Sequence, residues 1–149
     1  EIKNLCKKYK LNSQILNSGE LIKTNVEIVI LNSFGVLQNY FKYAKSVFIG
    51  KSMVKKLISD GGQNPIEAAR LNCKVYHGPY VYNFKEIYEL LKSNKMSEEI
   101  FSSDELASKI INSFNKKFEI NPSSIEKINI FNKNILDKTI DELNKIIKL

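Results

Sequence analysis

Residues 59–84 contain the residue types and spacings best suited to chemistry in this sequence. A glycine pair, Gly61-Gly62, precedes Asn64-Pro65, and proline is well tolerated at the first helical position because its missing N–H would be unpaired there anyway. The free N–H groups of a first helical turn, together with the helix dipole, favour an anion. Glu67 follows in that turn, where its carboxylate can accept hydrogen bonds from sugar hydroxyls. The pattern indicates an anion and sugar site, and a well-capped helix without a ligand is the alternative.

Further glycine-containing loops follow three expected strands, at 26–31, 46–49 and 74–77. Their glycines are Gly35, Gly50 and Gly78. The carboxyl ends of parallel strands meet at one edge of a sheet, and ligands bind outside that edge. The pair Gly61-Gly62 would also let a ligand approach the backbone closely. Convergence of these loops indicates a binding site, with ordinary glycine-containing turns as the alternative.

Strand and helix patterns alternate through most of the chain, which predicts an α/β fold: a Rossmann-like open parallel sheet with helices on both faces. The expected strands are short, nearly continuous apolar runs, as in buried parallel strands. Short strands are also expected within 11–16 and 95–101, and helices at 1–9, 36–44, 64–71 and 84–93. A capping box at 102–105 predicts a helix through 114, and Asn121-Pro122-Ser123-Ser124 predicts a second helix start. The apolar-periodic segments 125–131 and 135–147 form one helix or two.

The bulk composition is that of one globular domain, residues 1–149, with 43% hydrophobic and 26% charged residues. No apolar run approaches the ~20 residues of a membrane span. Cys6 and Cys73 form no CxxC motif and indicate a reducing compartment, and the single histidine, His77, cannot build a metal cluster with them. We expect no metal and no cofactor. Because the chain begins at Glu1 rather than Met, we expect it to be the later part of a longer protein.

The net charge of +7 comes almost entirely from lysine, and Arg70 is the only arginine. A basic balance is compatible with nucleic acid or an anionic membrane surface, and it can equally reflect a compositional habit of the source. Nucleic-acid readers usually carry clustered arginines and aromatic platforms, which this sequence lacks. We therefore expect no nucleic-acid partner.

Several common catalytic motifs are absent from the sequence. Gly50-Lys51-Ser52 looks like the end of a P-loop, but that motif needs a glycine where Lys45 stands. There is no G-x-G-x-x-G fingerprint, no G-x-S-x-G elbow and no H-E-x-x-H pair. His77 is better explained as a structural or ligand-edge residue than as a general base. No catalytic residue is predicted.

Taken together, these segments resemble the C-terminal half of the Kdo transferases, which move 3-deoxy-D-manno-octulosonic acid (Kdo) from CMP-Kdo onto lipid A precursors. The family shows G-G-[HQ]-N-P-L-E and then G-P-H-x-x-N-F, matched here by 61–67, Gly78-Pro79 and Asn83-Phe84. Residues 48–52 look like its F-V-G-G-S segment, and 32–37 occupy the place of its D-T-M-G-E-L segment. The resemblance covers nearly the whole chain.

The resemblance implies the nucleotide-sugar-binding domain of a two-domain GT-B enzyme. By resemblance, the donor nucleotide contacts Phe34, Gly35, Val36, Asn64, Pro65, Ile66 and Glu67. Residues that would line the donor site are Ser33, Gly50, Lys51, Ser52, Gly61, Gly62, Gln63 and Gly78.

The reaction implied is an inverting transfer of Kdo from CMP-Kdo to a lipid A precursor, lipid IVA, at the cytoplasmic face of the inner membrane. The general base, the acceptor site and any membrane anchor belong to the family's N-terminal half, so this chain alone is expected to be inactive. CMP-Kdo is the donor substrate, and no cofactor is implied.

Some positions depart from the family pattern: Val36 stands where the family has glutamate, Asn32 where it has aspartate, and Tyr80 where it has histidine. Two other functions therefore remain open. The chain could belong to another GT-B nucleotide-sugar transferase or epimerase, or it could be a degenerate, non-catalytic binding module.

Overall fold

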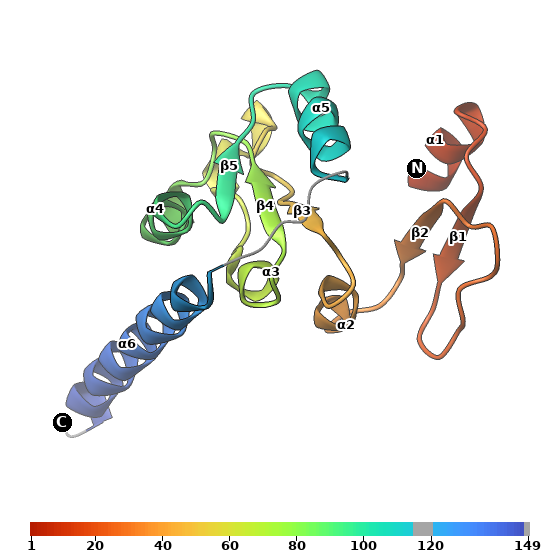
Figure 1. Cartoon of the computed structure of the whole chain (residues 1–149). Coiled ribbons are helices and arrows are strands. Elements are labelled where there is room, and N and C mark those ends of the chain that lie inside the picture. Colours follow the sequence, from red (N-terminus) through yellow and green to blue (C-terminus); the bar gives the residue numbers. More distant parts are fainter. Residues whose placement is uncertain (115–120, 148–149) are drawn as a thin grey trace. The chain divides into compact units, whose positions relative to one another are not determined.

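The computed structural model describes residues 1–114 and 121–147. Within them the chain forms two compact units, Glu1–Leu37 and Gln38–Leu149. Figure 1 shows the elements of both units along the chain. The predicted α/β class with parallel strands is confirmed.

The first unit contains α1 (Ile2–Lys8), β1 (Ser13–Leu16) and β2 (Ile28–Leu31). The two strands are parallel, with Ser13 opposite Ile28 and Leu16 opposite Leu31. α1 packs on the two strands and contacts both of them. This packing buries Cys6 of α1 and Leu16 of β1. The Gln14 side chain braces the loop between the strands, donating to Leu21 O at 2.9 Å and accepting from Lys23 N at 2.9 Å.

The second unit contains a three-stranded parallel sheet in the order β3-β4-β5. The strands are β3 (Ser46–Phe48), β4 (Lys74–His77) and β5 (Ser97–Glu99). The helices are α2 (Leu37–Phe41), α3 (Ile66–Arg70), α4 (Lys85–Ser93), α5 (Ser103–Phe114) and α6 (Pro122–Ile147), with the 3-10 turns η1 (Lys55–Asp60) and η2 (Tyr82–Phe84) between them. β4 lies at the centre of the sheet and has the bounds that the sequence predicted.

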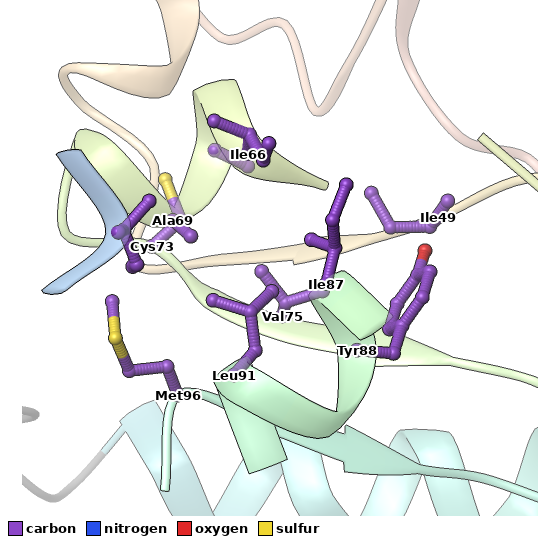
Figure 2. Packing of buried hydrophobic residues seen from close by; sticks show 11 residues of the cluster. Ile49, Ile66, Ala69, Cys73, Val75, Ile87, Tyr88, Leu91 and Met96 are labelled. Atoms are coloured by element: carbon purple, nitrogen blue, oxygen red, sulfur yellow. The ribbon is translucent and has the colours of Figure 1, made fainter. Parts of the chain in front are cut away.

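The core of this unit forms where the central strand β4 meets the helices. Val75 of β4 is fully buried, and Leu91 of α4 and Met96 are at most 1% exposed. Figure 2 shows these side chains gathered together with Cys73 and Ile87. Each fully buried side chain of this size contributes roughly 1.5–3 kcal/mol of transfer free energy, so this cluster is the main source of the unit's stability.

The thiol of Cys73 is part of this core rather than of a site. It is fully buried, and its Sγ lies 3.2 Å from the carbonyl oxygen of Phe41 and 3.4 Å from that of Ala44. Burial raises its pKa, because the apolar surroundings disfavour the thiolate. The thiol therefore links the end of α2 to the core in its neutral form.

The two helices at the C-terminal end begin at side-chain caps, as predicted. Ser102 Oγ accepts from Glu105 N at 3.1 Å, and the Glu105 carboxylate accepts from Phe101 N at 2.9 Å. Asn121 Oδ1 accepts from Ser123 N at 3.0 Å at the start of α6. α6 runs to Ile147 without interruption, so the two apolar-periodic segments form one helix. None of the helices in residues 1–114 and 121–147 has the length and apolar character required to cross a bilayer.

Candidate functional site

The hydroxyl of Ser52 forms hydrogen bonds that connect the loop after β3 with the loop after β4. Ser52 is fully buried, and its Oγ donates to Ile49 O at 2.6 Å while accepting from Gly78 N at 2.8 Å. Its backbone carbonyl accepts from Tyr80 N at 2.9 Å. The loop after β3 and the loop after β4 therefore form one hydrogen-bonded unit at the carboxyl ends of the strands.

Gly78 is a glycine because the Ser52 loop packs directly against it. A Cβ at this position would overlap the Ser52 carbonyl and the Met53 side chain. Since the carbonyl belongs to the backbone, a larger residue at position 78 could enter only if the two loops separated.

The glycine pair has a similar explanation, which differs from the expected approach of a ligand. Gly61 and Gly62 are buried and left-handed, with φ of +58° and +78°. A Cβ on Gly61 would lie 2.7 Å from the Asn83 side chain, whose Nδ2 donates to Asp60 O at 2.9 Å. A Cβ on Gly62 would lie 3.2 Å from Val81 Cγ1. Contact between the two glycine motifs therefore explains why both positions are glycine.

The helix after the glycine pair starts two residues later than predicted. Asn64 Oδ1 accepts from Ile66 N at 2.9 Å, so residues 64 and 65 form a side-chain-capped turn and α3 begins at Ile66. One of the amides expected to be free for a ligand is therefore already paired. Pro65 and Ile66 are buried, whereas Asn64 and Glu67 are exposed and accessible to a ligand.

Glu67 lines a small pocket within the second unit. Its Oε1 accepts from Gln38 Nε2 at 2.9 Å, which joins α2 to α3. These two residues, with Arg70 and Leu71, line a cavity of about 180 Å³. Its polar groups are a carboxylate, an amide and a guanidinium, which can bind hydroxyls and carbonyl oxygens. None of the four is a nucleophile paired with a base, so the pocket is suited to binding rather than to catalysis.

Part of the predicted site lies in the other unit. Ser33, Phe34, Gly35 and Val36 belong to Glu1–Leu37, where Phe34 is fully exposed and Gly35 has φ of +75°. Within the second unit, the structure brings together the loops at Gly50, Gly61-Gly62 and Gly78. The loop at Gly35 belongs to the first unit.

Lys51 forms a salt bridge rather than presenting an unpaired charge to a ligand. Its Nζ lies 3.0 Å from Asp60 Oδ2, and both side chains are partly exposed. Its φ of +64° is left-handed, a conformation that glycine adopts without strain. Lys51 is therefore one of the positions in the described residues where a glycine would relieve backbone strain.

His77 and Tyr88 are buried next to the loop that follows β4. His77 Nδ1 lies 2.8 Å from Gly78 O, so this nitrogen carries the proton that the hydrogen bond needs. The imidazole packs on the Tyr88 ring with centroids 4.3 Å apart, and Tyr88 Oη donates to Gln63 O at 3.0 Å. Burial lowers the pKa of His77 because the charged imidazolium loses hydration.

This lowered pKa predicts a pH-dependent stability. In the unfolded chain His77 has a pKa of about 6.5, so below that pH the unfolded state binds a proton more readily than the folded state does. The free energy of unfolding should therefore be highest above pH 6.5 and fall as the pH drops toward the folded pKa of His77. Urea unfolding at pH 7.5 and 5.5 measures this fall, and a smaller fall is expected in His77→Phe. Equal falls in the two proteins would contradict the assignment to His77.

Sequence reasoning missed Gln38, Arg70 and Tyr88. Arg70 carried a detectable signal, since it lies three residues after Glu67 and therefore on the same helical face. Gln38 and Tyr88 act across long sequence separations, which no local pattern reveals. In the described part of the chain no group of three or more His, Cys, Asp or Glu could hold a metal ion.

Comparison with known proteins gives this site a context. No family model matches the chain. Over 90 residues, which are 60% of this chain, it is 30% identical to the 3-deoxy-D-manno-octulosonic acid transferase of Haemophilus influenzae. The fold is similar to the crystal structure of the C-terminal CMP-Kdo binding domain of WaaA from Acinetobacter baumannii, with a TM-score of 0.69 and 18% identity over 85% of this chain and 62% of that one. The chain is thus similar in sequence to part of one Kdo transferase.

The resemblance expected from the motifs is thereby confirmed, both in sequence and in fold. The match spans 20% of the length of the Haemophilus Kdo transferase. At 18% identity the Acinetobacter domain establishes the fold alone.

Proposed function

We propose that this chain is the donor-binding domain of a Kdo transferase and binds CMP-Kdo. The observation that carries the proposal is the network around Ser52, Gly61-Gly62 and Gly78, which joins the separate Kdo-transferase motifs at the carboxyl ends of β3 and β4. Glu67, the exposed acidic residue of the first motif, lines the pocket of about 180 Å³ in the same unit. Ligands of open α/β sheets bind outside this edge, which supports the proposal.

In this function the chain holds the nucleotide, and the rest of the enzyme supplies the acceptor and the base. The acceptor hydroxyl bonds to the anomeric carbon of Kdo with inversion, the bond from that carbon to the phosphate oxygen breaks, and the hydroxyl proton passes to the base. Cytidine monophosphate leaves with the bonding electron pair. A preorganised donor site favours this step by stabilising the leaving group's charge.

The remaining properties of the enzyme are proposed from the same family relation. The acceptor is a lipid A precursor such as lipid IVA, bound by an N-terminal half at the cytoplasmic face of the inner membrane. The reaction uses CMP-Kdo without a further cofactor or a metal, and no nucleic acid takes part. The chain by itself binds nucleotide without turnover.

Titration of the ¹⁵N-labelled chain with CMP tests the proposal. The amide signals of Asn64, Ile66 and Glu67 are expected to shift, because these residues belong to the proposed nucleotide contacts within the second unit. UMP should cause smaller shifts at the same concentration. A stronger response to UMP would favour another nucleotide-sugar enzyme of the same architecture, and no response to either nucleotide would contradict nucleotide binding.

A further inference from the structure

We propose that Gln38 is a specificity-determining residue that orients the Glu67 carboxylate toward the 2′- and 3′-hydroxyls of a ribose. This inference rests on the proposed function, since it concerns the nucleotide's sugar. Both side chains line the cavity of about 180 Å³ between α2 and α3, where Gln38 holds the carboxylate in place.

The geometry that supports this role is a single long-range hydrogen bond. Gln38 Nε2 donates to Glu67 Oε1 at 2.9 Å across 29 positions of sequence. A carboxylate on an exposed side chain can rotate about its last bond, because such terminal torsions are broad. An amide bound to one oxygen restricts that rotation and leaves the second oxygen with its full acceptor capacity.

The lining of the cavity suits a sugar better than an isolated phosphate. The Glu67 carboxylate accepts hydrogen bonds from neutral hydroxyls, and its charge offsets the attraction of Arg70 for a phosphate. Arg70 and the Gln38 amide add donors for hydroxyl oxygens, and Leu71 supplies an apolar wall. A vicinal diol can donate to the carboxylate while accepting from these groups, so the cavity is chemically matched to a ribose.

The test compares CMP with 2′-deoxy-CMP, which lacks one of the two hydroxyls. The full chain is expected to bind CMP about 10-fold more tightly, as for a hydrogen bond to a charged acceptor. In Gln38→Met the side-chain length is kept and the donor is lost. The ratio of the two dissociation constants should then fall to about 2, with 2′-deoxy-CMP affinity changed by less than about twofold, since that ligand depends least on the oriented carboxylate.

A matched control comes from the same helix. Asn39 is exposed on α2 and does not line the cavity, so Asn39→Leu should leave the ratio unchanged. An unchanged ratio in Gln38→Met, or an equal loss of affinity for both nucleotides, would overturn the role of Gln38 and leave the proposed function standing. Failure of the unmutated chain to bind CMP would instead overturn the proposed function and this inference with it.

Discussion

Replacing Gly78 by alanine is expected to destabilise the second unit by about 2–4 kcal/mol. The added Cβ would overlap the Ser52 carbonyl and the Met53 side chain, and the carbonyl cannot rotate away as a side chain can. Overpacking typically costs about 1–3 kcal/mol, and losing the bond from Gly78 N to Ser52 Oγ adds about 1 kcal/mol. A total of about 2–4 kcal/mol is a large part of the roughly 5–15 kcal/mol that stabilises a typical domain. Urea unfolding followed by circular dichroism measures the loss.

Gly50→Ala is the control for this prediction. Gly50 lies in the adjacent loop, its φ is not left-handed, and a Cβ there would meet no atom within 4 Å. Its substitution should change the free energy of unfolding by no more than about 1 kcal/mol. If Gly78→Ala were as stable as Gly50→Ala, the contact between the two loops would not be a determinant of the fold.

The second large effect is expected at Glu67, where Glu67→Gln should weaken CMP binding about 10- to 100-fold. The substitution keeps the shape and the contact with Gln38 but removes the charge that strengthens hydrogen bonds from ribose hydroxyls. A hydrogen bond to a charged group contributes about 1.5–3 kcal/mol, and each 1.4 kcal/mol is tenfold in affinity. Isothermal titration calorimetry with CMP measures the change. Because Glu67 is exposed, the melting temperature should hardly move.

Glu86→Gln provides the comparison. Glu86 is also an exposed acidic residue in a first helical turn, that of α4, and it does not line the Glu67 cavity. It should bind CMP as the unmutated chain does. Equal effects of the two substitutions would mean that general charge, rather than the cavity, governs nucleotide affinity.

Local patterns predicted the elements well where the chain's own periodicity decides them. β4 matches the strand predicted at 74–77, and three of its four residues are buried, as in a central parallel strand. α6 is continuous because neither glycine nor proline follows Pro122 within it, so nothing interrupts its backbone hydrogen bonds. The capping residues Ser102 and Asn121 marked helix starts through bonds to amides only two or three residues away.

The site was less predictable because its geometry depends on contacts between distant segments. The start of α3 was misplaced because the Asn64 side chain takes the Ile66 amide, an alternative to helix that composition alone does not reveal. The contact of the glycine pair with Asn83 and Val81 joins segments about 20 residues apart, which no local pattern indicated. The bond from Gln38 to Glu67 required the packing of α2 beside α3, which no local pattern encodes.

Each unit contains one buried cysteine, and its thiol becomes reactive only when the surrounding structure opens. Cys6 is 4% exposed in the first unit and Cys73 is fully buried in the second, and the sequence contains no other thiol. A thiol-reactive dye reaches such a group only when the surrounding structure opens, so the labelling rate at each position follows a local opening equilibrium. Mass spectrometry of the labelled peptides would therefore read the two units separately in one sample, without an engineered probe.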